Sequence, residues 1–291
     1  MSLYSYKVFL EVADCGSFVK ASEKLSLSPS AVSHAVKSLE NEFGFSLFLR
    51  SRSGAAVTPN GQRVLPYVRS LVKMQNNIEQ EVSIINSFDV GTVKIGMFSS
   101  VASNWFIKIL HDFRENNPGI DVVFQQGDYT DIMSWLRSGE VDMAFTTDEL
   151  AKDTNFLPLM SDRLITVTSD DFVPENGQSV TSADFKKSTI IINKECEQYD
   201  ARRFLKDNDI HPDAYYETVT HQTLFAMVKE GMGICIIPEL VAKAAPAGVR
   251  KYPIAGDPSR VIGITYSDPE TVSPAAKLLT EEIITYVSHL N

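Results

Sequence analysis

The stretch SLSPSAVSHAVKSLE, residues 26–40, decides how the N-terminal part of this chain folds. Ser28 can accept a backbone N–H as a helix N-cap, and Pro29 fits the first helical position because its missing N–H would be unpaired there. Apolar residues then recur three and four positions apart: Val32, Ala35, Val36 and Leu39. This spacing predicts an amphipathic helix that begins at Pro29 and packs one face into a core.

The opposite face of this helix is short and polar, which favours an exposed contact surface. The candidate contact residues, including the two at the helix start, are Ser28, Pro29, Ser30, Ser33, His34 and Lys37. Helical spacing also marks residues 3–14 and 18–25, with Gly16-Ser17 between them, and Gly44 supplies a stop. Two short helices joined by a tight turn form a helix-turn-helix, whose second helix enters the DNA major groove.

A candidate β-hairpin follows the predicted recognition helix. Residues 47–50 and 55–57 are strand-like and flank the turn-like residues 51–54. Arg50 and Arg52 would then lie on a wing, where they meet phosphate or a minor groove. The alternative is a generic three-helix domain that binds protein.

Residues 59–90 are predicted to form a linker helix after the winged domain of residues 1–58. Apolar residues recur along it in a heptad pattern: Val64, Val68, Leu71, Ile78, Val82 and Ile85, with Gln75 at one intervening position. A single stripe of this kind needs another helix to cover it, so we expect a dimer seam. The alternative is that the stripe docks on the chain's own domain.

The charge distribution is compatible with DNA binding by the N-terminal part. The chain has 291 residues, 44% hydrophobic and 22% charged, so we expect a globular protein with a sizeable core. Its net charge is −10, yet residues 1–90 hold nine Lys or Arg against eight Asp or Glu, and the remainder hold eighteen against twenty-nine. A local basic stripe is sufficient for a DNA footprint, so the acidic total does not exclude one.

The sequence shows no sign of secretion or membrane insertion. No apolar run reaches the roughly eighteen residues that span a membrane, and Glu11 and Asp14 interrupt the N-terminal segment. Cys15, Cys196 and Cys235 have no CxxC spacing, which argues against a disulfide framework or a zinc site. We therefore predict a cytoplasmic protein in which each cysteine is a small buried hydrophobic residue. The alternative for Cys196 is a redox-sensitive thiol, because it lies in a charged loop, but no partner cysteine follows nearby.

Residues 91–291 alternate between strand and helix patterns. The predicted strands are 92–96, 120–125, 141–145, 164–168, 190–192, 234–238 and 263–266, and the predicted helices are 105–116, 131–139, 200–207, 224–230 and 274–290. This alternation favours βαβ units and a mainly parallel sheet. Two such sets predict two lobes with a ligand between them: lobe I at about 91–163 and 265–291, and lobe II at about 164–264.

The N-terminal motifs resemble those of the LysR-type transcriptional regulators. The matching motifs, which run without gaps over residues 3–65, are Gly16-Ser17, the helix up to Ser38-Leu39-Glu40, Phe43-Gly44, Leu47-Phe48, Arg50, and Val57-Thr58-Pro59 with Gly61. The resemblance implies a winged helix-turn-helix, a linker helix and a two-lobed α/β effector domain like the periplasmic binding proteins. Pro29, Ser30 and His34 depart from residues common in the family, so the operator sequence cannot be carried over.

The same resemblance implies the partners of the chain. They are double-stranded DNA, a small-molecule effector, RNA polymerase, and further copies of the chain in a homodimer that assembles into a homotetramer. We expect no cofactor beyond the effector.

Candidate effector-binding residues lie at predicted strand ends. Ser99 and Ser100 follow the first strand at a helix N-terminus, where hydroxyl and N–H groups can bind a carboxylate or carbonyl. The resemblance adds residues after later strands: Asp128, Thr147, Asn193, Thr220 and His221. The alternative for Ser99, Ser100 and Thr147 is plain capping or turn chemistry. We expect Asp128 to point to solvent, because a buried carboxylate is costly unless it is paired.

No catalytic motif is present. The sequence lacks a Gly-x-Ser-x-Gly elbow, a Walker loop and a His-Glu-x-x-His zinc motif, and its five histidines are far apart. We therefore predict no enzyme and no metal site, but a sequence-specific transcriptional regulator controlled by an effector bound between two lobes. The competing hypothesis is a pure small-molecule receptor whose N-terminal helices only mediate association.

Overall fold

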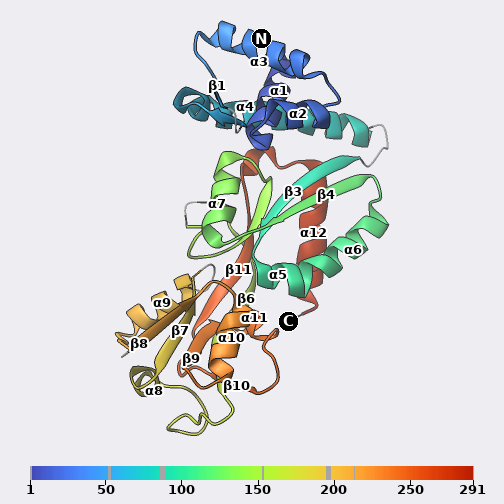
Figure 1. Cartoon of the computed structure of the whole chain (residues 1–291). Coiled ribbons are helices and arrows are strands. Elements are labelled where there is room, and N and C mark those ends of the chain that lie inside the picture. Colours follow the sequence, from blue (N-terminus) through green and yellow to red (C-terminus); the bar gives the residue numbers. More distant parts are fainter. Residues whose placement is uncertain are drawn as a thin grey trace.

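The computed structural model describes residues 2–51, 54–85, 90–152, 154–194, 198–212 and 214–290. Figure 1 shows three parts in line: a small helical domain that holds the N-terminus, a middle lobe and an outer lobe. We call the middle lobe, which begins with the strand after residue 90, lobe I, and the outer lobe lobe II.

The N-terminal domain contains three helices and a hairpin. They are α1 (Leu3–Cys15), α2 (Phe18–Lys24), α3 (Pro29–Phe43), and β1 (Phe48–Ser51) paired antiparallel with β2 (Gly54–Val57). Ser28 Oγ accepts the Ala31 N–H at 3.2 Å, and Gly44 ends α3 with a left-handed φ of 76°. The predicted start and end of the recognition helix are confirmed.

The apolar face of α3 forms the centre of the N-terminal core. Val32, Val36 and Leu39 are fully buried, and they share one cluster with Phe9 of α1 and Leu47 before the hairpin. The helical spacing of the sequence therefore identified the buried face correctly.

Helix α4 (Pro59–Ile85) joins this domain to lobe I. Lys73 Nζ lies 3.4 Å from Asp142 Oδ1 and donates to Ser267 Oγ at 2.6 Å. Asn77 Nδ2 donates to the Thr271 carbonyl at 2.8 Å. These polar side-chain contacts therefore hold α4 against lobe I.

The strands of the two lobes form one continuous sheet. They are β3 (Gly91–Met97), β4 (Ile120–Gln126), β5 (Met143–Thr147), β6 (Leu157–Ser169), β7 (Thr189–Asn193), β8 (Ala214–Thr218), β9 (Ile234–Pro238), β10 (Val249–Pro253) and β11 (Ser259–Tyr266). Among the described residues the order is β4-β3-β5-β11-β6-β9-β7-β8, with β10 paired to β6. Lobe I contains β3 to β5, lobe II contains β7 to β10, and β6 and β11 run between the lobes.

The expectation of a mainly parallel sheet is wrong. Strands β3, β4 and β5 are parallel, as are β7, β8 and β9, but every pairing of β6, β10 and β11 is antiparallel. The strand expected at 164–168 begins earlier, at Leu157. The apolar pattern did not predict its first half because polar residues such as Asp162 interrupt the pattern there. The chain crosses between lobes on β6 and returns on β11, which reverses the strand direction.

Helices cover both faces of the sheet. They are α5 (Ser99–Val101), the π-helical turn η1 (Ala102–Phe106), α6 (Ile107–Asn116), α7 (Tyr129–Ser138), α8 (Ser182–Lys186), α9 (Gln198–Asp207), α10 (His221–Lys229), α11 (Glu239–Ala242), the 3-10 turn η2 (Pro269–Thr271) and α12 (Pro274–Ser288). In lobe II, Ile190 and Ile192 join one buried cluster while Ile191 joins the other, as strand alternation requires. The helix expected at 105–116 starts earlier, at Ser99, through the π-helical turn.

Candidate functional site

Helix α3 lies at the end of the molecule farthest from lobe II (Figure 1), and its polar face is exposed. The exposed side chains on this face are Pro29, Ser30, His34 and Lys37. Ser28 is also exposed, and its Oγ lies 2.9 Å from Ser30 Oγ, while Ser33 is half-buried. Lys37 Nζ lies 3.8 Å from Glu40 Oε2 and stays largely in solvent. The structure therefore brings the predicted contact residues of α3 together.

The hairpin is fixed to the end of α3 by hydrogen bonds. Glu40 Oε1 accepts the backbone N–H groups of Leu47 at 2.7 Å and Phe48 at 3.4 Å. The Arg50 backbone pairs with Ala55 in the hairpin. The Arg50 side chain and all of Arg52 lie outside the described residues, so the wing arginines stay a prediction.

The predicted seam on α4 divides into two parts. Val68 is buried and Val64 partly buried in the N-terminal core, as expected from the alternative that this part of the stripe docks on the chain's own domain. These two residues fit the heptad spacing, and the first turns of α4, on which they lie, pack against α1. The remaining apolar seam residues are exposed on the surface of this chain: Leu71, Ile78, Val82 and Ile85.

The carboxyl ends of the parallel strands of both lobes converge on one region. Tyr129, after β4 of lobe I, donates through its hydroxyl to Asp200 Oδ2 on α9 of lobe II at 3.3 Å. Asn104, after β3, donates to the carbonyl of Leu240, after β9, at 3.3 Å. Strand ends of a doubly wound sheet are where ligands bind, so this convergence marks the candidate effector region.

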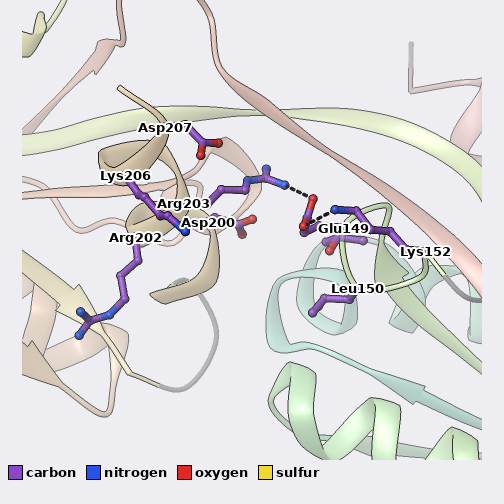
Figure 2. Close-up of a pocket in the computed structure, with 9 residues that line it drawn as sticks. Glu149, Leu150, Lys152, Asp200, Arg202, Arg203, Lys206 and Asp207 are labelled. Carbon is purple, nitrogen blue, oxygen red and sulfur yellow. Dashed lines mark hydrogen bonds and ion pairs between the residues drawn. The ribbon is translucent and has the colours of Figure 1, made fainter. Parts of the chain in front are cut away.

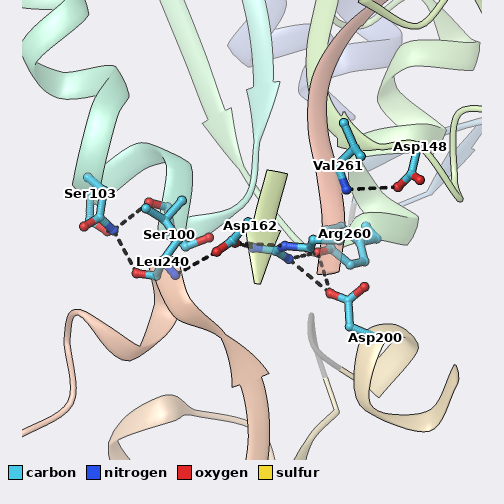
Figure 3. Close-up of polar contacts among 10 residues, drawn as sticks. Ser100, Ser103, Asp148, Asp162, Asp200, Leu240, Arg260 and Val261 are labelled. Carbon is cyan, nitrogen blue, oxygen red and sulfur yellow. Dashed lines mark hydrogen bonds and ion pairs between the residues drawn. The ribbon is translucent and has the colours of Figure 1, made fainter. Parts of the chain in front are cut away.

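A buried charge cluster lies at this convergence (Figure 3). The Arg260 side chain, on β11, is 1% exposed and donates from Nε at 3.1 Å and Nη2 at 2.8 Å to Asp162 Oδ2 on β6. Its Nη1 donates to Asp200 Oδ2 at 3.1 Å and to the Tyr129 hydroxyl. The Phe98 ring centroid lies 5.0 Å from Arg260 Cζ, which places the guanidinium over an aromatic face. We call Arg260, Asp162, Asp200 and Tyr129 the interlobe cluster.

The interlobe cluster keeps its cation charged. Burial alone would lower the pKa of the Arg260 guanidinium, but Tyr129, Asp200 and Asp162 outweigh burial and raise that pKa above its usual range. Asp162 Oδ1 also accepts the Leu240 N–H at 3.0 Å, so this carboxylate is bonded on both oxygens. One buried cation therefore meets two buried carboxylates drawn from β6 and from lobe II.

A cleft of about 630 Å³ opens beside the interlobe cluster (Figure 2). It is lined by Thr147, Glu149, Leu150 and Lys152 from the end of β5, and by Asp200, Arg202, Arg203, Lys206 and Asp207 from α9. Glu149 bridges the two sides: Lys152 Nζ lies 2.6 Å from its Oε1 and Arg203 Nη1 lies 3.2 Å from its Oε2. The hydrogen bond from Lys152, together with Arg203, holds the pKa of Glu149 below its usual range.

The predicted lobe I effector residues lie around this region but make different contacts. Thr147 is buried and lines the cleft. Ser100 is buried with no hydrogen-bond partner for its Oγ among the described residues, and Ser99 is half-buried beside it. The half-buried Asp128 does not simply point to solvent: its Oδ1 accepts the Asp131 N–H at 2.8 Å and caps α7.

The predicted lobe II effector residues lie at the end of β7 and at the start of α10. Asn193 is buried at the end of β7. Thr220 is exposed and caps α10 by accepting the Thr223 N–H at 3.2 Å. The His221 ring stacks on Phe225. Of the seven predicted effector residues, only Thr147 lines the cleft described above.

The sequence analysis missed the interlobe cluster. Arg260 and Asp162 both fall inside strands whose predicted starts, at 263 and 164, came just after them. The available signal was the two-residue period of a strand: Asp162 and Arg260 lie two positions before the apolar Leu164 and Ile262 and share their buried face if each strand extends back. A buried charge needs a partner. Asp200 was assigned only as the start of a helix.

Comparisons with known proteins agree with this geometry. The model described as "LysR substrate binding domain" matches residues 87–287, and the model "Bacterial regulatory helix-turn-helix protein, lysR family" matches residues 3–62. The chain belongs to the LysR family of transcriptional regulators. This LysR-type regulator is 25% identical to the uncharacterized HTH-type transcriptional regulator YvbU of Bacillus subtilis, over 97% of both chains. It is 28% identical to the probable regulator LrrA of Synechococcus elongatus, over 90% of both.

Solved structures share the fold of the LysR-type regulator over its whole length. A full-length OxyR variant from Pseudomonas aeruginosa superposes with a TM-score of 0.78 at 20% identity, covering 97% of this chain and 94% of that one. Full-length CbnR complexed with its target DNA superposes with a TM-score of 0.55 at 17% identity, covering 99% and 100%. The predicted fold class, a winged helix-turn-helix with a two-lobed α/β domain, is confirmed.

The family settles the broad function. Its members are DNA-binding transcriptional regulators with a substrate-binding domain, not enzymes. Within the described residues, no group of three or more His, Cys, Asp or Glu side chains is arranged to hold a metal ion. None of the described helices is both long and apolar enough to cross a bilayer. Cys196 lies outside the described residues.

Proposed function

We propose that the LysR-type regulator reads a DNA operator with α3 and controls that binding through an effector held between its lobes. Ser30, Ser33, His34 and Lys37 would contact base edges and phosphates in the major groove, with Ser28 and Pro29 at the helix entrance. Arg50 and Arg52 would contact the DNA backbone from the wing. The observation that carries the assignment is the open polar face of α3 at the outer end of the molecule.

The composition of the α3 face supports a groove contact. Small hydroxyl side chains allow close approach of the helix backbone to base edges, and Lys37 adds a flexible cation that remains exposed. The apolar side of α3 is fully buried, so the polar side is the part of the helix that faces outward. CbnR, which shares the fold, is bound to its target DNA in a solved structure.

We infer further that two copies pair along α4 to present two recognition helices. Three exposed apolar residues, spaced seven and then four positions apart, lie on one side of α4: Leu71, Ile78 and Val82. We assign residues 1–58 to the DNA-binding domain, 59–90 to the linker and 91–291 to the effector domain. Assembly of dimers into a homotetramer, contact with RNA polymerase and a cytoplasmic location complete the proposal.

In vitro selection tests the DNA assignment. The full chain is incubated with a pool of random-sequence duplexes, and bound duplexes are amplified and sequenced over several rounds. We expect enrichment of two related half-sites whose centres are about 10 base pairs, or a multiple of it, apart, because a two-fold dimer meets successive turns of one face. A pool that stays random would contradict the proposal and favour a receptor without DNA contact.

The effector assignment rests on the convergence of strand ends from both lobes. A ligand that contacts lobe I and lobe II changes the relation between them only if it binds one arrangement more tightly than another. The region between the lobes holds Ser100, whose hydroxyl has no partner among the described residues, Thr147 on the cleft wall, and Asp200 between the interlobe cluster and the cleft. We propose that the effector binds here, with Ser99, Asp128, Asn193, Thr220 and His221 around it.

A further inference from the structure

The interlobe cluster carries more negative than positive charge. Arg260 is one cation, Asp162 and Asp200 are two carboxylates, and all three side chains are at most 6% exposed. A buried charge is stable only when it is paired and hydrogen-bonded. Within the interlobe cluster, two carboxylates therefore share one guanidinium.

Asp162 is the permanent partner of Arg260. The two residues are direct cross-strand neighbours in the antiparallel pairing of β6 with β11. Asp162 accepts two guanidinium N–H groups through Oδ2 and the Leu240 N–H through Oδ1. The register of the two central strands and these three hydrogen bonds hold the pair together.

Asp200 is held differently. It lies in the first turn of α9, in lobe II, and reaches across to the remaining edge of the guanidinium and to the Tyr129 hydroxyl of lobe I. It is also one of the residues that line the cleft. Asp200 can therefore leave Arg260 with α9 while the pair of Asp162 and Arg260 stays intact.

The lining of the cleft carries one more cation than carboxylate: Lys152, Arg202, Arg203 and Lys206 against Glu149, Asp207 and Asp200. Three of these cations are already paired, Lys152 and Arg203 with Glu149 and Arg202 with Glu217. Displacement of Asp200 would leave Arg260 Nη1 and the Tyr129 hydroxyl as two convergent donors, which is the geometry that a carboxylate accepts. The cleft would then lead directly to a buried cation.

We propose that Asp200 is an internal stand-in for a carboxylate group of the effector. In the effector-free protein it occupies the Nη1 edge of Arg260, and an effector that bears a carboxylate enters through the cleft, displaces Asp200 and releases α9. This inference rests on the proposed function and adds to it the chemical class of the effector and the residue with which it competes.

A chemical rescue experiment tests the proposal. In full-length Asp200→Ala, the vacated site is offered sodium formate or acetate, the smallest carboxylates, with sodium chloride at equal ionic strength as the reference. We expect formate to raise the midpoint of thermal unfolding of Asp200→Ala by about 3 to 6 °C at saturation, and the wild type by less, because its site is already occupied. Asp209→Ala, which removes an exposed carboxylate, should respond like the wild type.

Two further variants make the result decisive. Tyr129→Phe in the Asp200→Ala background removes one of the two donors and should weaken formate binding about tenfold. Asp200→Asn keeps the volume of the side chain and should show the same formate preference if Asp200→Ala does not fold. Equal responses to formate and chloride in both Asp200 variants would overturn the proposal, since Arg260 would then be a purely structural ion-pair partner.

The last arm links the site to DNA binding. Formate should change the affinity of Asp200→Ala for the selected duplex by at least about fivefold, while chloride at equal ionic strength should not. Formate binding without any change in DNA affinity would overturn the effector assignment. Failure of the wild type to bind any duplex would instead contradict the proposed function, so the two failures are distinguishable.

Discussion

Buried carboxylates have different structural roles in this regulator. Asp200 joins two lobes through a side chain that belongs to neither β6 nor β11, whereas Asp184 stabilises a single turn within lobe II. Asp184 is 5% exposed, and it accepts the Glu175 and Thr181 N–H groups at 2.9 and 2.8 Å. Both carboxylates follow the same rule, that burial requires hydrogen-bond donors, but only the contacts of Asp200 can change when the lobes move.

The pKa of Asp184 leads to a prediction about acid stability. Burial raises this pKa, but the Thr181 hydroxyl and the backbone donors outweigh burial and hold it below its usual range. The stabilisation is therefore fully present above the unfolded-state pKa near 4 and is lost as pH falls through the lower folded-state value. At neutral pH we expect Asp184→Asn to lower the free energy of unfolding by about 1.5 to 3 kcal/mol.

Urea unfolding followed by circular dichroism at several pH values measures this effect. The difference between wild type and Asp184→Asn should shrink below about pH 4. Asp171→Asn, which changes an exposed carboxylate, should show no comparable difference at neutral pH. A gap between wild type and Asp184→Asn that is constant with pH would contradict the assignment.

Contacts between residues close together in the sequence could be predicted from the sequence. The caps at Ser28 and Gly44 followed from residue type and spacing, because capping involves neighbours within four positions. Arg260 and Asp162 could not be paired in the same way: they are 98 positions apart and meet only because β11 returns beside β6. The contacts of the candidate effector residues depend on how the two lobes meet, which local patterns do not record.

At the scale of secondary-structure elements, α4 shows how one periodic pattern can serve two purposes. Its heptad repeat is continuous in the sequence, yet Val68 packs into the N-terminal core and Ile78 is exposed. Periodicity records that a face is apolar and does not record what covers it. The same limit explains β6, where Asp162 interrupts the apolar pattern although the strand extends back to Leu157.

The exposed part of α4 leads to a prediction about assembly. Ile78→Asp places a charge in the centre of the proposed seam, and burying an unpaired carboxylate should weaken the dimer at least about thirtyfold. Sedimentation velocity at micromolar concentration should show the wild type as a dimer or larger and the variant shifted toward the monomer.

A charge added elsewhere on α4 provides the control for this measurement. Asn76 is exposed and lies on the other side of the helix from Ile78, so Asn76→Asp should sediment like the wild type. Unchanged association of Ile78→Asp would place the dimer contact on another surface.

At the scale of the whole molecule, the N-terminal domain and the interlobe region are joined through lobe I. Helix α4 carries the N-terminal domain and is fixed to lobe I by Lys73 and Asn77. Lobe I in turn meets lobe II through Tyr129 and Asp200. Polar contacts therefore connect lobe II, through lobe I, to the linker helix.

The central claim is that α3 binds duplex DNA through its exposed polar face. Its most direct test is the salt dependence of binding, measured by fluorescence anisotropy with a duplex obtained by selection, for full-length wild type, Lys37→Ala and Lys277→Ala. Lys277 is an exposed lysine on α12, so its substitution matches the charge change far from α3.

We predict that wild-type affinity falls steeply between about 50 and 200 mM KCl. Lys37→Ala should bind more weakly and reduce the slope of log K against log [KCl] by about 1, while Lys277→Ala should match the wild type. Equal affinities and slopes for all three proteins, or binding that is insensitive to salt, would contradict the assignment of α3 as the DNA-binding element.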